Sequence, residues 1–134
     1  MTAALLDTSI LIAQFSGDET PPDLTGFDDL LVSSLSYSEM MFGLGAATDI
    51  DVYRERERRL RKIIEVFGEG LPFTDDCAFR IDQITRDVVR SGKNPRGRRI
   101  DHMIAAVAIA HDLTVVTRNA SDFQEIAGLR VEVR

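Results

Sequence analysis

The sequence contains a single cysteine, Cys77, so an internal disulfide cannot form. It has no zinc-type spacing of cysteine and histidine, no glycine-rich phosphate loop and no internal repeat. No apolar run reaches the roughly 18 residues of a membrane-spanning helix, and no basic segment followed by an apolar run opens the chain as an export signal. We therefore expect a cytoplasmic protein with no membrane partner. Because Cys77 shares a helical apolar pattern with Ile81, Ile84 and Val88, we expect it to be a small core residue.

The chain of 134 residues is 44% hydrophobic and 28% charged, which is near the average for globular proteins. A chain of this length can bury a core of its own but is short for two domains. We therefore expect residues 1–134 to form a single domain.

The net charge of −6 argues at first against a polyanionic partner, but the basic residues are concentrated in two segments. Residues 54–62 contain six basic residues against two acidic ones, and residues 93–99 contain four against none. The first segment has the pattern of the solvated face of an amphipathic helix. The second is a proline- and glycine-containing loop that leads to Asp101, and we expect it to contact a nucleic-acid backbone through Lys93, Arg96, Arg98 and Arg99.

Apolar periodicity predicts strands that alternate with helices. Such alternation favours an α/β fold of three layers, with a mostly parallel central sheet of about five strands and helices on both faces. Ser36 and Glu39 have the spacing of a capping box, and residues 17–26, with two prolines, predict a loop that includes a turn of helix. The expected strands are Ala3–Leu6, Leu30–Val32, Pro72–Thr74, Thr114–Thr117 and the edge strand Leu129–Val133, and the expected helices are Ser9–Ser16, Ser36–Ala47, Tyr53–Phe67, Cys77–Val89, Ile100–His111 and a helical turn at Asp122–Ala127.

Four acidic residues stand at the ends of predicted strands or near the starts of predicted helices: Asp7, Glu39, Asp101 and Asp122. In an α/β sheet these positions converge outside the carboxyl ends of the strands. Clustered carboxylates repel one another unless a cation compensates their charge, and a hard divalent cation prefers oxygen ligands. The pattern predicts an enzyme that depends on Mg²⁺ or Mn²⁺, with a phosphodiester as substrate.

Each acid also has a purely structural interpretation. Asp7 and Asp122 could cap the helices that follow them, Glu39 could complete the capping box, and Asp101 could favour the positive end of its helix. Capping alone does not require all four to meet at one edge of the sheet, and it would accept serine or asparagine at each position. We expect structural roles for His102, which points to the surface or packs beside the site, and for His111 at the end of its helix.

Four segments in this order resemble the conserved blocks of the PIN-domain ribonucleases, and among them the VapC toxins of toxin–antitoxin pairs. They are Leu5–Ile12, Val32–Glu39, Asp101–Ala106 and Val116–Phe123, and together they extend over nearly the whole chain.

The resemblance implies a Mg²⁺- or Mn²⁺-dependent endoribonuclease that forms a homodimer and is blocked by a cognate, VapB-like antitoxin. It implies that Asp7, Glu39, Asp101 and Asp122 are catalytic metal-site acids, with either one or two metal ions. It also implies that polar residues support these acids. The supporting positions are Thr8, Thr117, Asn119 and Ser9, which stands where many members have asparagine, while Asp112 replaces a glycine frequent in the family.

Other functions remain open at this stage. A PIN-like nuclease could process RNA without acting as a toxin. A phosphoacceptor module would use Asp7, but it normally has a lysine after a late strand, where this chain has Arg118 and Asn119. An aspartyl phosphatase would have a second aspartate where Ser9 stands, and a non-catalytic interaction module could keep the acids as caps.

Overall fold

The computed structural model describes residues 2–17 and 20–134. Strands alternate with helices as expected, and most ends differ from the predicted ones by only a few residues. The strands are β1 (Ala3–Leu6), β2 (Asp29–Leu31), β3 (Thr114–Thr117) and β4 (Arg130–Val133), and the helices are α1 (Thr8–Phe15), α2 (Ser34–Gly45), α3 (Ile50–Phe67), α4 (Asp75–Arg90), α5 (Arg99–Ala110) and the 3₁₀ helix η1 (Ala120–Asp122).

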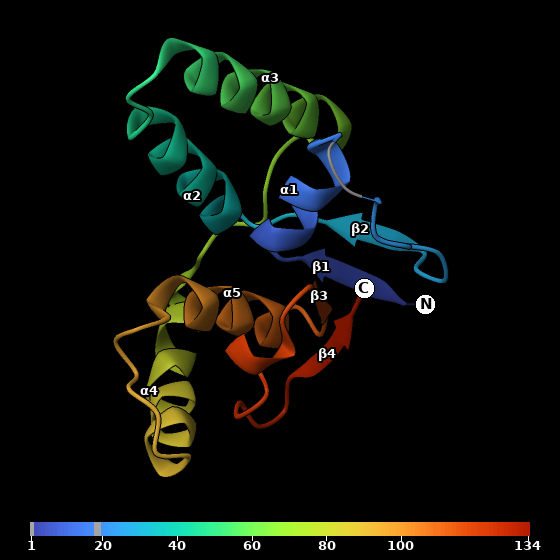
Figure 1. Ribbon diagram of the computed structural model, residues 1–134. Helices are drawn as coiled ribbons and strands as arrows, with labels where there is room; N and C mark the ends of the chain where they lie inside the picture. Colours follow the sequence, from blue (N-terminus) through green and yellow to red (C-terminus); the bar gives the residue numbers. More distant parts are fainter. Residues whose placement is uncertain (1, 18–19) are drawn as a thin grey trace.

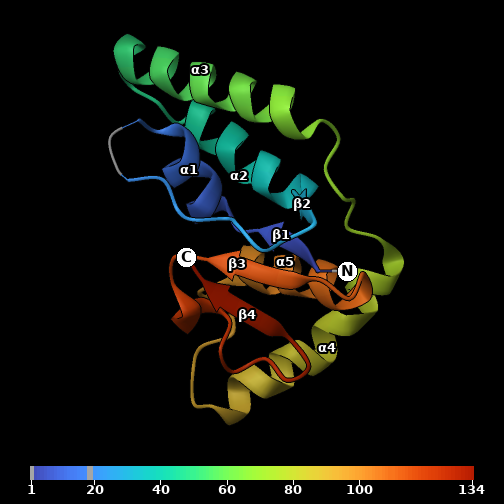
Figure 2. The same ribbon diagram turned by 90° about the vertical axis from the view of Figure 1, so that its right-hand side faces the viewer.

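The strands form a parallel sheet in the order β2-β1-β3-β4. Helices α1, α2 and α3 lie on one side of it, and α4 and α5 lie on the other (Figures 1 and 2). This arrangement confirms the expected three-layer α/β fold. Since all strands run in the same direction, the ends of β1 and β3 lie side by side, with Leu6 paired to Val116.

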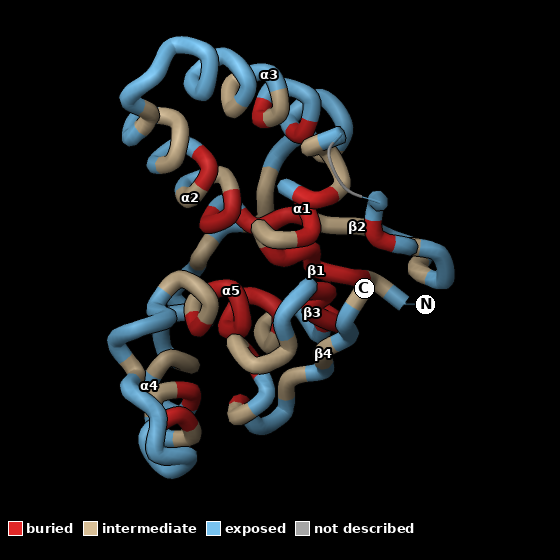
Figure 3. The backbone as a smooth tube through the Cα atoms, in the orientation of Figure 1, coloured by how far each residue is buried: buried red, intermediate tan, exposed pale blue. Residues whose placement is uncertain are grey.

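Alternation along the strands divides the core into two parts. Leu5 and Val115 pack with α4 and α5, whereas Leu6 and Val116 pack with α1 and α3. Burial is concentrated in the central strands β1 and β3 and in α1 and α5, and the outer side of α3 is exposed (Figure 3). Cys77 is completely buried in the first of these clusters, as expected.

The expected fifth strand at Pro72–Thr74 is wrong, because the described part of the chain forms a sheet of four strands. Leu71 makes only an isolated parallel bridge to Ser33. In a parallel pair, alternate residues bond to the neighbouring strand, so after Leu71 the next residue to pair would be Phe73, with the carbonyl of Ser34. Ser34 is already the first residue of helix α2, so the pairing ends there. A side chain at Gly70 would approach the backbone nitrogen of Ser34 to 2.7 Å, so this close passage requires glycine.

The predicted capping box of Ser36 and Glu39 is also wrong. Helix α2 begins earlier, with Ser33 as the N-cap residue, and its hydroxyl accepts a hydrogen bond of 3.0 Å from the backbone N–H of Leu35. Ser36 therefore lies inside the first turn, and Glu39 lies beyond the reach of the cap. The carboxylate of Glu39 is consequently available for other contacts.

The predicted helical turn at Asp122–Ala127 is displaced toward the N-terminus, where η1 is capped by Asn119. The side-chain oxygen of Asn119 accepts hydrogen bonds from the N–H and the hydroxyl of Ser121, which starts the turn early. Residues 18–19 of the predicted loop lie outside the described residues, and no helical turn occurs in residues 20–28. Asp112, which stands where the family frequently has glycine, has a φ of 55°, a left-handed conformation that aspartate tolerates better than most residues. None of the described helices has both the length and the apolar character needed to cross a bilayer.

Candidate active site

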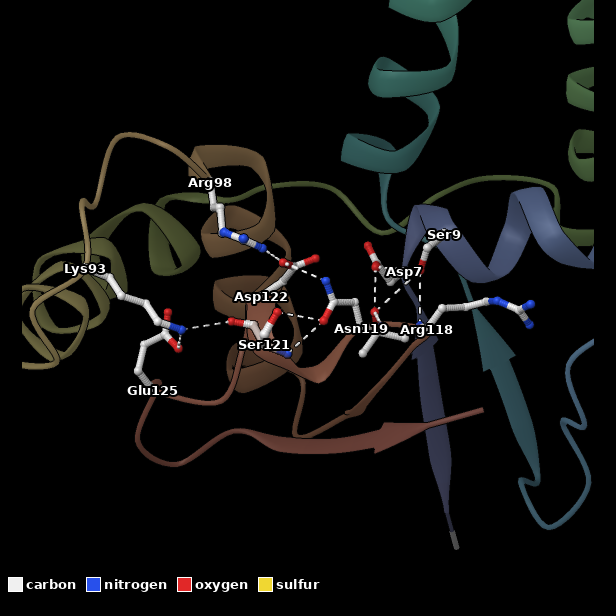
Figure 4. A network of polar contacts seen from close by, with 10 residues as sticks. Asp7, Ser9, Lys93, Arg98, Arg118, Asn119, Ser121, Asp122 and Glu125 are labelled. Atoms are coloured by element: carbon white, nitrogen blue, oxygen red, sulfur yellow. Dashed lines mark hydrogen bonds and ion pairs between the residues drawn. The ribbon is translucent and has the colours of Figure 1, made fainter.

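Asp7 connects the end of β1 to the start of α1. Its side chain is only 4% exposed, and it accepts hydrogen bonds from the N–H of Thr8 and from the hydroxyls of Ser9 and Thr117, at 2.8 to 2.9 Å. Asp7 is therefore the N-cap of α1, as its structural interpretation proposed. A cap needs only the first contact, however. The two hydroxyl contacts hold the carboxylate in one orientation at the edge of the sheet (Figure 4).

Thr8 connects α1 to α2. Its hydroxyl contacts an oxygen of Glu39 at 2.6 Å and the hydroxyl of Ser36 at 3.0 Å. A hydroxyl has a single hydrogen to donate, and a carboxylate can only accept. The Thr8 hydroxyl therefore donates its hydrogen to Glu39, and the Ser36 hydroxyl donates to the Thr8 oxygen. The contact between Thr8 and Glu39 joins residues that are 31 positions apart in sequence, and it holds the Glu39 carboxylate near the end of β1.

Asp101 lies in the first turn of α5 and is partly buried. Burial, together with the negative charges of Asp7 and Glu39, raises the pKa of Asp101 to about 6, although the Arg98 guanidinium opposes the shift. Burial also raises the pKa of Glu39, and the Asp7 charge adds to this, while the hydrogen bond from Thr8 lowers it. These three carboxylates therefore share one electrostatic environment.

The oxygen ligands of this group match the preference of a hard divalent cation. The repulsion that raises the pKa of Asp101 is also the kind that a bound cation would relieve. Within residues 2–17 and 20–134, no three histidine, cysteine or acidic side chains are already gathered closely enough to coordinate one ion. The chemistry of the ligands therefore fits a divalent metal, but a complete coordination shell would require the carboxylates to move closer together.

Asp122 lies in a different environment from the other three acids. It forms an ion pair with Arg98, and the Asn119 side-chain amide lies 3.5 Å from it (Figure 4). Asn119 also donates its backbone N–H to the hydroxyl of Thr117, which in turn donates to Asp7. The expected polar residues thus connect Asp122 to Asp7, while Arg98 compensates the charge of Asp122.

The basic loop has two kinds of residue. Lys93 contacts Glu125 at 3.2 Å and the carbonyl of Ser121 at 3.3 Å, so it holds the segment after η1 in place. Arg98 is engaged by Asp122. Arg96 and Arg99 are exposed and line a cavity. The other basic segment lies on the largely exposed helix α3, where arginines pair with glutamates of the same helix, as expected for a solvated face.

His102 is 4% exposed, so it packs beside the site and does not point to the surface. Burial lowers the pKa of His102. The residue pairs that sequence analysis missed are Thr8 with Glu39 and Arg98 with Asp122. Each pair joins separate elements, so no local spacing in the sequence reveals it.

We predict that Thr8→Val raises the pKa of Glu39 further, because valine has a similar shape but removes the hydrogen bond that lowers this pKa. A carboxyl titration of Glu39 followed by NMR measures the shift. Thr48→Val, an exposed substitution of the same kind in the loop before α3, is the control. An unchanged pKa of Glu39 in Thr8→Val would show that the contact is unimportant in solution.

The chain is similar in sequence and in fold to known proteins. The family model described as PIN domain matches residues 4–129. Ribonuclease VapC1 of Rickettsia felis is 25% identical over 132 residues, which cover 95% of this chain and 92% of the relative. The two proteins are therefore similar along almost their entire lengths.

Solved structures agree with this similarity. A chain in the crystal structure of the toxin–antitoxin system VapBC-5 from Mycobacterium tuberculosis is 30% identical, with a TM-score of 0.74 and coverage of 99% of this chain and 98% of that one. A chain of FitAcB from Neisseria gonorrhoeae is 27% identical, with a TM-score of 0.75 and coverage of 96% and 95%. A chain of VapBC2 from Rickettsia felis, bound to a promoter DNA fragment, shares the fold with a TM-score of 0.80 at 21% identity over 99% of both chains.

Proposed function

The chain belongs to the PIN-domain family, and from this premise we propose that it is a metal-dependent endoribonuclease and the toxin of a VapBC-type pair. The observation that carries the proposal is the shared environment of Asp7, Glu39 and Asp101 at the edge of the sheet, seen in the raised pKa of Asp101. Its similarity to Ribonuclease VapC1 and to a chain of VapBC-5 supports the same conclusion.

Asp7, Glu39 and Asp101 would hold Mg²⁺ or Mn²⁺, and Asp122 would join them if it separates from Arg98. A bound divalent ion supplies Lewis acidity, which activates water and stabilises charge on the phosphate oxygens. Asp7 is oriented in advance by its hydrogen bonds to Ser9 and Thr117. Asp101 must be ionised to act as a ligand, so we expect activity to decline below about pH 6.

Two features of the site disfavour the alternative functions. A phosphoacceptor aspartate must be accessible to its phosphodonor, whereas Asp7 is buried and engaged by three hydrogen bonds. Acids that served only as caps would not need to be brought together, yet Thr8 connects Glu39 to the start of α1.

The RNA backbone would pass along the basic loop. All four basic residues of the loop are exposed, but Lys93 and Arg98 form ion pairs with acidic groups of the chain itself, whereas Arg96 and Arg99 form none with the described residues. Two further partners are proposed: a VapB-like antitoxin, and a second copy of the chain in a homodimer. The proposed location of the protein is the cytoplasm. The solved structure of the toxin–antitoxin system VapBC-5 supports the antitoxin as a partner.

We predict that the double variant Arg96→Gln and Arg99→Gln binds single-stranded RNA more weakly, whatever its sequence. The slope of log affinity against log salt should fall by about 1.4, because each lost phosphate contact accounts for about 0.7 with single strands. Filter binding in EDTA across a salt series measures the slope. Arg86→Gln with Arg90→Gln removes the same charge from the exposed part of α4 and serves as the control. An equal loss of slope in both double variants would place the RNA elsewhere.

Cleavage of an end-labelled single-stranded RNA tests the proposed activity. We expect internal cleavage with Mg²⁺ or Mn²⁺ and none in EDTA. Cleavage that persists undiminished in EDTA would contradict the dependence on metal. If the purified protein cuts no RNA with either ion, the endoribonuclease proposal is wrong.

A further inference from the structure

A cavity of about 450 Å³ opens between α4, α5 and the loop that joins them. Figure 1 shows this loop returning alongside α4 to the start of α5. The walls of the cavity include the apolar side chains of Phe73, Ile81 and Met103, and its lining also includes the exposed residues Arg96 and Arg99. The cavity therefore combines apolar walls with two positive charges and lies within the size range of small-ligand sites.

His102 adds an unsatisfied polar group to this lining. His102 is only 4% exposed, and its Nε2 atom, which has almost no accessible surface, has no hydrogen-bond partner among the described residues. A buried polar atom without a partner costs free energy, and most such atoms are satisfied by protein, water or ligand. Because this atom is inaccessible, the His102 ring must turn before Nε2 can bond an occupant of the cavity that the residue lines.

The cavity adjoins the acidic site. His102 follows Asp101 directly in α5, and Arg99 lies in the same first turn. Arg98, at the start of this helix, pairs with Asp122 on the side of the acids. A polyanion whose backbone follows the basic loop would therefore pass both the cavity and the carboxylates.

We propose that this cavity holds one nucleobase of the RNA strand, beside the bond that is cut; this inference rests on the proposed ribonuclease function. The base stacks against Phe73 and the aliphatic wall, and Arg96 and Arg99 contact the adjacent phosphate. The edge of the base bonds to His102 Nε2 once the ring has turned toward the cavity. Recognition of RNA commonly combines these elements, because an unstacked base has an apolar face and a polar edge while its phosphate is anionic. The cavity would give the enzyme a base preference next to its cleavage position.

The charges at the cavity favour this occupant over an apolar protein segment. A segment that covered only the walls would leave His102 Nε2 unsatisfied and would crowd two arginines without compensating them. A nucleotide satisfies the apolar, hydrogen-bonding and positive groups together.

The test uses the full chain in EDTA, so that no cleavage is required. The four 5′-mononucleotides and short single-stranded RNAs that differ in one base are titrated while NMR follows the His102 ring and the Met103 methyl group. We expect at least one base to shift both signals. Thr85→Trp fills the cavity from α4, and it should weaken this binding at least about tenfold. Gln83→Trp, on the exposed side of the same helix, should bind like the wild type.

Several results would overturn the inference. Shifts of both signals with inorganic phosphate alone, equal to those with nucleotides, would show an anion site without a base. Undiminished binding in Thr85→Trp would place the nucleotide elsewhere. A change of oligomeric state in Thr85→Trp, with nucleotide binding unaffected, would assign the cavity to a protein contact.

Cleavage distinguishes an RNA base from a free nucleotide. Thr85→Trp should cut RNA more slowly than the wild type with Mg²⁺ or Mn²⁺, because its binding is weakened, and it should lose the preference for one base near the cut. If mononucleotides bind and this preference is unchanged, the cavity serves a free nucleotide and the inference fails. If the wild type cuts no RNA, the proposed function fails, while binding of the short RNAs in EDTA still decides whether the cavity holds a base.

Discussion

Asp101→Asn is expected to reduce metal-dependent RNA cleavage at least about a thousandfold while the fold is retained. Asparagine has nearly the same shape but lacks the negative charge that would hold a divalent cation. The loss corresponds to about 4 kcal/mol of transition-state stabilisation, since each tenfold change in rate equals about 1.4 kcal/mol. Single-turnover cleavage at pH 8 with Mg²⁺ and with Mn²⁺ measures it.

The same substitution should stabilise the metal-free protein, and the gain should depend on pH. The folded pKa of Asp101, about 6, lies above the ordinary aspartate pKa of 3.8, so the folded state binds the proton more tightly. This group therefore destabilises the fold progressively as pH rises from about 4 to about 6, and fully above that. Removing the charge should raise stability above pH 6 by about 1 kcal/mol, after allowance for partial exposure, and should change little below about pH 4.

Asp75→Asn is the matched control, since Asp75 also lies in the first turn of a helix but is exposed and far along the chain from the acids. It should leave cleavage unchanged and should not stabilise the protein at pH 8, because it loses a favourable interaction with the helix dipole. If Asp101→Asn cuts RNA at the wild-type rate, Asp101 is not part of the metal site. Thermal unfolding in EDTA at several pH values tests the stability prediction separately.

Expression of the wild-type chain without a partner should arrest bacterial growth, and co-expression of its antitoxin should restore it. This follows from the proposed toxin role. Expression of Asp101→Asn at the same soluble level should permit growth, which separates cleavage from the burden of expression. Growth unaffected by abundant wild-type protein would contradict the toxin role, although a nuclease without that role would remain consistent with cleavage in vitro.

The antitoxin is expected to place an arginine in the acidic site. A guanidinium can bond two carboxylate oxygens at once and would compete with the metal ion. The Arg98 and Asp122 pair shows the same chemistry within this chain. An antitoxin peptide that inhibits cleavage equally well after its arginines are replaced would contradict this mode of inhibition. Cleavage assays with and without excess Mn²⁺ would reveal the competition.

The sequence by itself determined the layers of the fold and the positions of the acids. Alternation of apolar strands and amphipathic helices requires parallel pairing with helices on both faces, and parallel strands bring their carboxyl ends to one edge. The location of Asp7 after β1 and of Asp101 at the start of α5 follows from these rules. The solvated face of α3 could also be predicted from the sequence, because its charged residues recur at helical spacing within one element.

Only the tertiary structure decided which of these side chains meet. Helix α2 begins directly after the bridge of Ser33 with Leu71, so the sheet has four strands in the described residues. Because Ser33 caps α2, the carboxylate of Glu39 is available to Thr8. Asp122 pairs with Arg98, although its position near a strand end suggested a place with the other acids. These outcomes depend on contacts between residues distant in sequence, whose geometry is fixed by the packing of α2 and α5 against the sheet. Local propensity and spacing contain no information about such contacts.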